Sequence, residues 1–166
     1  MGKSMKTPIL ETSRLWLRPL KEEDAPDAFL WTGDPKVSWY MRYETHESLE
    51  DTKQWLREEE KQLDSDLLYD FGFHKKDNDE LIGSGGLTFN QQQGIWELGC
   101  NLRRDCWNQG YGTEAAAAIL SFAENTLHIH RVMARHAKDN TASGRVLEKN
   151  GFYAKLYRSQ FVQTAS

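Results

Sequence analysis

The chain has 166 residues, a length that suits a single domain with enough apolar core to fold alone. Its formal net charge is −4, its composition is that of an ordinary soluble protein, and its six tryptophans argue against disorder. Lysine and arginine form no long basic face, and no apolar run approaches the length of a membrane span, which argues against nucleic acid and membrane as partners.

The first residues of the chain carry no strong pattern and no apolar signal core. We therefore expect a tail over residues 1–11, followed by a single domain over residues 12–166. Residues 14–18 alternate between polar and apolar side chains and are followed by Pro19. Because proline cannot donate to a neighbouring strand, this segment is predicted to be an edge strand.

Two helices are predicted next. Asp24 is placed to cap a helix that ends near Gly33. Ser48 and Asp51 resemble a capping box, with aspartate in place of glutamate or glutamine, and they open a helix to about residue 63.

Strands dominate the middle of the chain, and helices alternate with strands after it. Three segments rich in apolar and aromatic residues, 67–74, 81–89 and 95–102, are separated by turn residues and predict an antiparallel meander. This order predicts a mixed α/β sheet of the α+β type, with flanking helices. The later elements are expected to be a helix at 111–127, a strand at 131–136, a helix at 140–150 and a last strand at 152–162.

The most informative segment lies at the start of the helix expected at 111–127. Residues 107–115 are Trp-Asn-Gln-Gly-Tyr-Gly-Thr-Glu-Ala, with Gly110 and Gly112 where the helix begins. The first N–H groups of a helix have no intrahelical partner and carry part of the dipole's positive charge. Glycine also lets a bulky anion approach the backbone. The turn therefore predicts a pyrophosphate site, although a helix start that binds no ligand has the same local pattern.

Two common nucleotide motifs do not fit this turn. A dinucleotide fingerprint has a tight turn before its glycines, and residues 103–108 are too long and polar for it. A P-loop has a lysine after its last glycine, and this chain has Thr113 there.

Three segments in a fixed order make the pattern specific. Glu97-Leu-Gly is followed by Trp-x-x-Gly-x-Gly-Thr-Glu-Ala from Trp107 and by Asn-x-x-Ser-x-x-Val-Leu-Glu-Lys-x-Gly-Phe from Asn140. With these segments the chain resembles the GNAT acetyltransferase superfamily, and within it the RimJ/RimL-like branch, whose members acetylate protein N-termini or small amines. The strand at residues 14–18 is also similar to that branch, so the resemblance covers residues 12–152.

The resemblance implies a GNAT fold in which two central strands splay apart and hold acetyl-CoA, here residues 97–102 and 131–137. It implies transfer of the acetyl group from this co-substrate, without a metal, to an amine on a small molecule or a peptide N-terminus. Asn140 and Ser143 would contact the cofactor, or else serve as a helix cap and a polar residue at the helix start. The residues implied to bind the cofactor are Leu102 (through its backbone), Trp107, Asn108, Gln109, Gly110, Tyr111, Gly112, Thr113, Asn140 and Ser143.

For catalysis the resemblance indicates Glu97 as a tentative base, because similar enzymes carry an acidic residue at the matching place. The alternative is a solvated strand glutamate. Many members have a tyrosine seven residues after the helix asparagine, where this chain has Leu147. The general acid is therefore unassigned, with Tyr153 and Tyr157 as candidates. A module that binds or senses acyl-CoA without catalysis, or one that binds another nucleotide, is the competing hypothesis.

The acetyl acceptor has no motif of its own. Trp39, Tyr40 and Met41 are candidates for a wall of its site, and aromatic residues there are equally expected from core packing. Ser84 and Asn90 face either the substrate or a turn.

The cysteines and the C-terminus carry two further expectations. Cys100 and Cys106 do not have the spacing of a zinc site, and reduced thiols favour a cytoplasmic protein. After residue 152 we expect too few residues to complete the sheet. Either the last strand is truncated, or a second subunit completes the pairing in a homodimer.

Overall fold

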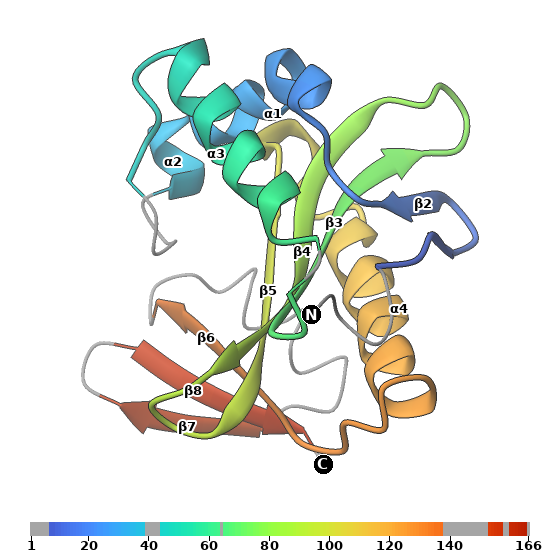
Figure 1. Ribbon diagram of the computed structural model, residues 1–166, viewed down its shortest axis with the longest axis vertical. Helices are drawn as coiled ribbons and strands as arrows, with labels where there is room; N and C mark the ends of the chain where they lie inside the picture. Colours follow the sequence, from blue (N-terminus) through green and yellow to red (C-terminus); the bar gives the residue numbers. More distant parts are fainter. Residues whose placement is uncertain (1–6, 39–43, 64, 138–152, 158–159, 166) are drawn as a thin grey trace.

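Eight strands form one sheet in the computed structural model, in the order β1-β2-β3-β4-β5-β6-β8-β7 (Figure 1). The structure describes the backbone of residues 7–38, 44–63, 65–137, 153–157 and 160–165. The strands are β1 (Leu10–Glu11), β2 (Leu15–Arg18), β3 (Leu68–Lys75), β4 (Leu81–Asn90), β5 (Ile95–Leu102), β6 (Val132–Ala137), β7 (Tyr153–Tyr157) and β8 (Gln160–Ala165). The helices are η1 (Glu22–Asp24), α1 (Ala25–Thr32), α2 (Pro35–Ser38), α3 (Leu49–Lys61), η2 (Arg104–Cys106) and α4 (Tyr111–Asn125).

The predicted meander is confirmed. Strands β3, β4 and β5 pair antiparallel in sequence order, and β5 has the predicted bounds. The sheet changes direction at β5, because β6 pairs with it in parallel. A parallel pair needs a crossover, and α4 supplies it. The mixed sheet with flanking helices is therefore as expected.

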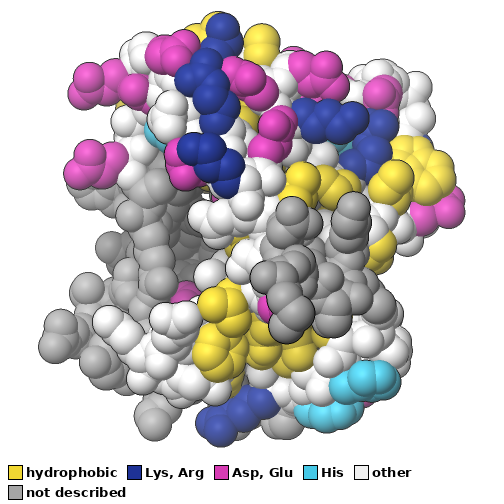
Figure 2. Space-filling view, viewed as in Figure 1, with side chains coloured by type: hydrophobic (Ala, Val, Ile, Leu, Met, Phe, Trp, Pro, Cys, Tyr) yellow, Lys and Arg dark blue, Asp and Glu magenta, His cyan; other side chains and the backbone are white. Residues whose placement is uncertain are grey.

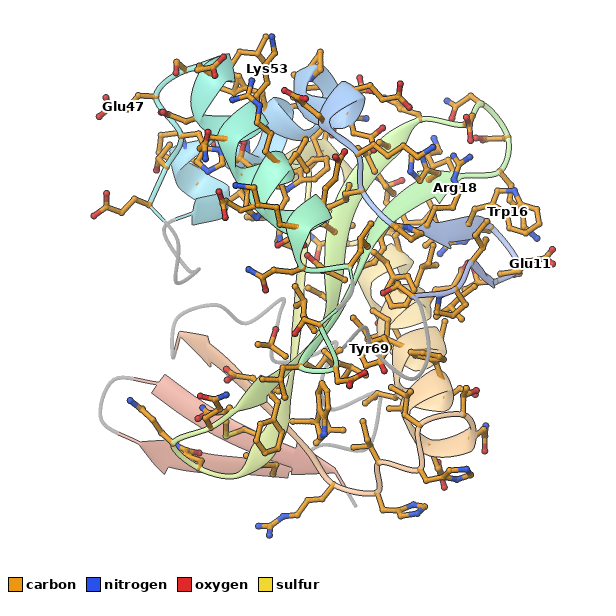
Figure 3. The ribbon with its side chains drawn as sticks, viewed as in Figure 1. Glu11, Trp16, Arg18, Glu47, Lys53 and Tyr69 are labelled. Atoms are coloured by element: carbon orange, nitrogen blue, oxygen red, sulfur yellow. The ribbon has the colours of Figure 1, made fainter. Side chains whose placement is uncertain are left out.

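The N-terminal boundary differs from the prediction. Leu10 and Glu11 were expected to belong to a tail, but they form β1 and pair with Leu17 and Trp16 of β2. For this reason β2 is not the edge strand that its sequence predicts. Figure 3 shows Glu11 and Trp16 together at this outer edge of the sheet. The pairing was not visible in the sequence because a strand of two residues has no measurable alternation.

The expectation of an incomplete sheet was wrong. Strands β7 and β8 form an antiparallel pair, and β8 lies between β6 and β7. All six residues of β6 pair with β8, from Val132 opposite Ala165 to Ala137 opposite Gln160. The last strand expected at 152–162 is in fact two strands, β7 and β8. The sheet therefore pairs β6 within one chain and needs no second subunit for it.

One face of the sheet packs on α4. Alternate residues of the strands point to this face, among them Phe71, Leu87 and Leu98, and they meet Ile119 of α4 in the main core. Tyr69 makes an edge-on contact with Phe122 of α4, with ring centroids 5.6 Å apart. Figure 3 shows Tyr69 between the strands and this helix.

The other face carries α1 and α3. A second core joins Trp31 of α1 and Leu56 of α3 to Leu81 of the sheet. The predicted cap of α3 is confirmed, since the Ser48 hydroxyl accepts a hydrogen bond from the backbone N–H of Asp51. The Asp51 carboxylate bonds to the N–H of Glu47, one residue earlier than a capping box would place it.

Charges of both signs are mixed over the outer surface of α1 to α3 (Figure 2). The described part of the chain contains no helix of sufficient length and apolarity to cross a membrane.

Candidate active site

The turn between β5 and α4 has the geometry of an anion cradle. Asn108 and Gly110 both have left-handed backbone conformations, with φ of 62° and 84°. These two residues reverse the chain so that α4 begins directly after them. The first hydrogen bond of α4 runs from the N–H of Glu114 to the carbonyl of Gly110. The N–H groups of Tyr111 and Gly112 precede this bond and have no partner within the helix, so they suit a bound anion.

Side chains from distant elements hold this turn in place. Arg14, which directly precedes β2, donates through Nη1 to the carbonyl of Gln109 at 3.1 Å. Its guanidinium also lies 4.1 Å from the centroid of the Tyr111 ring. The indole N–H of Trp107 donates to the carbonyl of Leu102 at 2.9 Å and ties the turn to the end of β5. The turn is therefore fixed without a ligand.

The segment that leads into the turn is fixed by ion pairs. Arg103 pairs with Asp105, with Nε and Oδ1 2.5 Å apart, and with Glu80 at the start of β4. Arg104 pairs with Asp34 between α1 and α2, with Nε and Oδ2 3.1 Å apart. Glu80 beside β4 and Asp34 after α1 thus both help to position the segment before the turn.

Strands β5 and β6 part close to this turn. Their parallel pairing covers three positions and ends where Leu98 lies opposite Ala134. Beyond this point β5 continues to Leu102 paired only with β4, and β6 continues to Ala137 paired only with β8. Figure 1 shows the two strands diverging. In an extended strand every second residue directs its N–H and C=O to the same side. The stretch from Gly99 to Leu102 therefore presents backbone hydrogen-bonding groups to the opening.

A cavity of about 210 Å³ lies on the α1 and α3 face of the sheet, beside this opening. Three strands provide its floor, and two helices with the segment before α3 cover it. Its lining residues are Leu68 and Asp70 of β3; Ser84, Gly85, Gly86 and Thr88 of β4; Gly99 and Asn101 of β5; and Trp31, Thr32, His46, Trp55 and Glu59 above them.

Glycines create the depth of this cavity. Asp70, Gly86 and Gly99 lie opposite one another across β3, β4 and β5. Gly86 has no room for a side chain, because a Cβ there would lie 1.9 Å from the carbonyl oxygen of Tyr69. A Cβ at Gly99 would meet nothing within 4 Å, so it would project into open space. Asp70 is consequently the only side chain of this row.

Two carboxyl groups meet at the cavity wall. Glu59 of α3 and Asp70 of β3 are partly buried and hydrogen-bonded to each other. Burial raises the pKa of Glu59, and the neighbouring Asp70 charge raises it further. Burial also raises the pKa of Asp70, against the hydrogen bonds from Glu59 and Phe71. The pair therefore holds a proton at a pH where each carboxyl alone would have lost it.

His46 is held at the same wall by a buried pair of threonines. Its Nδ1 lies 2.8 Å from Thr52 Oγ1, which lies 2.9 Å from Thr32 Oγ1. Burial lowers the pKa of His46, although Asp51 partly opposes this, so the ring is neutral at neutral pH.

The predicted site residues fall into three groups. Leu102 and residues 107–113 lie together between the end of β5 and the start of α4, and their contact with a cofactor stays a prediction. Glu97 lies opposite Met133, one position before the pairing of β5 with β6 ends. It is not among the residues that line the cavity. Asn140 and Ser143, with Leu147, Trp39, Tyr40 and Met41, lie outside the described residues.

The remaining candidates divide between cavity and turn. Ser84 lines the cavity, and its hydroxyl accepts a hydrogen bond from Asn101 Nδ2 at 3.3 Å. Asn90 instead serves the turn after β4, where its side chain accepts from the N–H groups of Gln92 and Gln93. Cys100 and Cys106 are both free thiols. Among the described residues, no three histidine, cysteine or acidic side chains are grouped to hold a metal.

The sequence patterns did not predict that Glu59 and Asp70 meet. They also did not predict that Trp31 and His46 line the cavity. One signal was present, since Asp70 is the single acidic residue inside a strand of apolar, aromatic and glycine residues. Its partner on α3 could not be identified, because Glu59 is one of three consecutive glutamates.

Comparisons with known proteins agree with this geometry. A model of the acetyltransferase (GNAT) domain matches residues 14–153. The chain is 30% identical over 156 residues to the uncharacterized N-acetyltransferase YoaA of Bacillus subtilis, covering 93% of this chain and 88% of the relative.

Solved structures share the fold. A GNAT-family acetyltransferase from Bacillus anthracis superimposes with a TM-score of 0.81 at 22% identity, covering 95% of this chain and 97% of the other. RimL, a ribosomal L7/L12 α-N-protein acetyltransferase in complex with coenzyme A, superimposes with a TM-score of 0.76 at 16% identity, covering 95% and 96%. With the domain match over most of its length, the chain belongs to the GNAT family and is an acetyltransferase.

Proposed function

We propose that this chain transfers an acetyl group from acetyl-CoA to a primary amine, on a small molecule or at a protein N-terminus. The observation that carries the proposal is the anion cradle at the start of α4, next to the opening between β5 and β6. Helix N–H groups suit the pyrophosphate, and the free side of β5 suits the amides of the pantetheine arm. The similar RimL structure is a coenzyme A complex, which supports the same ligand.

In this proposal each part of the cofactor has its own residues. Residues 107–113 surround the pyrophosphate, and the backbone of Leu102 contacts the pantetheine. The thioester then lies near Gly99, where the cavity reaches β5. Asn140 and Ser143 complete the cofactor site from the segment after β6.

The reaction requires a neutral amine, because an ammonium group has no lone pair. The amine nitrogen attacks the thioester carbonyl carbon directly in a ternary complex, so a C–N bond forms and the C–S bond breaks. The substrate nitrogen loses one proton to a base before the attack and a second as the tetrahedral intermediate collapses to the amide. The departing thiolate takes up one proton, so one proton is released overall. Backbone N–H groups of β5 that face the opening are placed to stabilise the oxyanion.

Glu97 is the proposed base. It lies two residues before Gly99 on the same face of β5, and Asn90 Nδ2 donates to its Oε2 at 3.5 Å. From this position it reaches an amine at Gly99 through a water molecule.

A turnover assay tests the proposal. Acetyl-CoA is offered with a panel of amines and N-terminal peptides, and thiol release is measured together with the mass of the acceptor. Acetylation of an amine with equal release of coenzyme A is the expected result. Acetyl-CoA binding without thiol release for any acceptor would identify a binding or sensing module instead. The absence of a thermal shift with acetyl-CoA would reject this ligand.

A further inference from the structure

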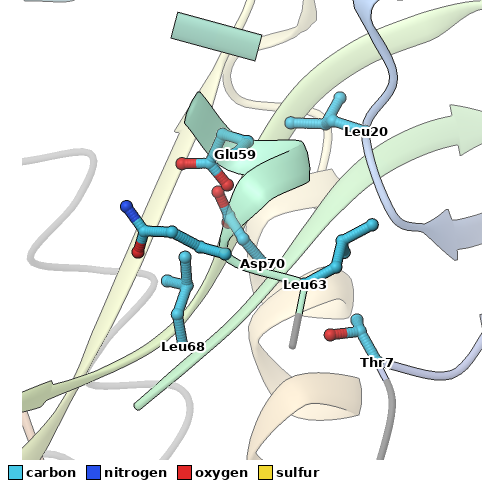
Figure 4. Close-up of a pocket in the computed structure, with 7 residues that line it drawn as sticks. Thr7, Leu20, Glu59, Leu63, Leu68 and Asp70 are labelled. Carbon is cyan, nitrogen blue, oxygen red and sulfur yellow. The ribbon is translucent and has the colours of Figure 1, made fainter. Parts of the chain in front are cut away.

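The Glu59–Asp70 pair places two carboxyl groups in a cavity whose other described lining residues carry no carboxyl group. Figure 4 shows the two carboxyl groups facing each other between α3 and β3. No lysine or arginine occurs among the described residues that line the spaces on either side of the pair. Two carboxyl groups that share one proton keep one negative charge, and nothing described in the cavity neutralises it.

Two residues that line the cavity each have a further polar atom without a hydrogen-bond partner in the described part of the chain. Trp31 is fully buried and lines the cavity, and its indole N–H is unpaired. Asn101 also lines the cavity, and its Oδ1 is buried and unpaired although its Nδ2 bonds to Ser84. Unpaired buried polar atoms are costly in a folded protein. Together with the carboxyl pair, they indicate a polar ligand rather than an apolar one.

The distance from the pair to the opening is set by the sheet. Asp70 and Gly99 are separated by β4, so their backbones lie two strand spacings apart, about 10 Å. This is too far for either carboxyl to take a proton from an amine that attacks a thioester at Gly99. It is a suitable distance for a second group of the same acceptor molecule, because Asp70, Gly86 and Gly99 line one continuous cavity.

We propose that the Glu59–Asp70 pair binds a second cationic nitrogen of the acetyl acceptor, about 10 Å from the amine that is acetylated. The inference rests on the proposed function and specifies its substrate class. The acceptor is a primary amine with a second positive charge, either a small diamine or a peptide N-terminus with a basic side chain. A neutral amine of the same length fills the same space but leaves the buried charge unpaired.

Binding of a cation to the Glu59–Asp70 pair should release a proton. Burial keeps the proton on the pair, and a bound cation stabilises both carboxylates, so the pKa of the pair falls and the proton goes to solvent. The other titratable group that lines this space is His46 from the segment before α3, and Cys100 of β5, which packs on the opposite face of the sheet, is close enough to feel the Asp70 charge. His46 is neutral at neutral pH, and burial with the Asp70 charge raises the pKa of Cys100 to about 12, so the thiol stays protonated.

The test compares two acceptors that differ in one group. A diaminoalkane with nitrogens about 10 Å apart is compared with the amino alcohol of equal length, in which a hydroxyl replaces one ammonium. The wild-type enzyme should have a KM at least about tenfold lower for the diamine. In Glu59→Gln and Asp70→Asn the preference for the diamine over the amino alcohol should disappear. Glu58→Gln is the matched control, because Glu58 is exposed on the same helix and its carboxylate accepts from Gln54 and Lys61 of that helix.

A second pair of acceptors distinguishes the sources of the cation. A peptide with lysine near its free N-terminus is compared with the same peptide carrying norleucine. A preference for the diamine alone assigns a small-molecule acceptor, and a preference for the lysine peptide assigns a protein N-terminus.

Failure of this inference differs from failure of the proposed function. Acetylation with equal KM values for charged and neutral acceptors in the wild type would overturn the inference and leave the function intact. No acetylation of any amine would reject the function.

If neither variant folds, calorimetry of the wild type with coenzyme A and the diamine in two buffers decides. A buffer-dependent enthalpy that reports proton release supports the inference, and a buffer-independent enthalpy contradicts it.

Discussion

The Arg14 side chain and Glu114 on α4 form an ion pair, with Nε and Oε1 2.8 Å apart, although 100 residues separate them in sequence. The backbone N–H of Arg14 and the hydroxyl of Thr12 donate to the other carboxylate oxygen. These bonds lower the pKa of Glu114, although burial opposes the shift. The pair fastens the start of α4 to the first strands, and Arg14 also contacts Gln109 and Tyr111 of the anion cradle.

Removal of the Arg14 side chain should therefore weaken cofactor binding. Arg14→Ala frees the carbonyl of Gln109 and the face of Tyr111, so the cradle must be ordered when the cofactor binds. We expect the Kd for coenzyme A to rise about tenfold, measured by calorimetry. Arg18→Ala is the control, since Arg18 pairs with the exposed Asp79 away from the turn. An equal change in both variants would show that the Arg14 contacts do not matter for binding.

Gly110 should be required for both stability and binding. Its φ of 84° is unfavourable for any residue with a side chain, and a Cβ there would lie 3.2 Å from Arg14 Nη2. Gly110→Ala should lower the free energy of unfolding by about 1–2 kcal/mol and weaken coenzyme A binding. Gly94→Ala is a matched control, because Gly94 has a φ of 65° and nothing within 4 Å of its Cβ. It should lose similar stability with unchanged affinity, and a loss of affinity there would contradict the assignment.

Substitution of Gly99 should separate stability from acceptor binding. Gly99→Ala projects a methyl group into open space at the cavity floor, so the melting temperature should stay nearly constant. The KM for the acceptor should rise, because the methyl group would occupy space beside the proposed position of the thioester. Gly86→Ala should instead destabilise the fold, since its Cβ would collide with the carbonyl oxygen of Tyr69. A Gly99→Ala enzyme with unchanged acceptor kinetics would exclude the cavity as the acceptor site.

Glu97→Gln tests the proposed base. Replacement of the carboxylate by an amide keeps the size of the side chain and removes its capacity to accept a proton. We expect kcat/KM to fall about 100-fold at neutral pH, with coenzyme A affinity unchanged. The remaining activity should rise with pH, as more of the acceptor amine becomes neutral in solution. Retention of full activity would assign Glu97 to a structural role.

The Glu59–Asp70 pair should make the folded state less stable as pH rises. The pKa of Glu59 is raised from its ordinary value of 4.5, so above that value the folded chain retains a proton that the unfolded chain loses. Stability contributed by this proton is lost as pH rises toward the folded pKa, by up to about 1.4 kcal/mol per pH unit.

The pH range that best isolates this effect lies between the ordinary pKa values of histidine, 6.5, and cysteine, 9.0. Within this range neither residue type dominates the change of stability with pH. Urea unfolding at a series of pH values should show a falling stability for the wild type. Glu59→Gln should show a flatter dependence, and a wild-type stability that rises with pH in this window would contradict the shared proton.

Local patterns were sufficient to predict β5 and α4. The bounds of β5 and the first residue of α4 match, because alternation, turn residues and the two glycines all act within a few residues of each other. The same reasoning located the turn that forms the anion cradle, and its ligand stays a prediction. It failed for β1, which is too short to alternate, and for β8, whose place between β6 and β7 depends on the sheet and not on its own residues.

The sequence by itself thus determined the family, the glycine turn before α4 and most helices and strands, because these depend on neighbouring residues. Only the tertiary structure decided which distant side chains meet. The register of β3, β4 and β5 places Asp70 in one row with two glycines, and the packing of α3 brings Glu59 onto it. Such contacts depend on the sum of many weak packing preferences, and no single segment of the chain contains them.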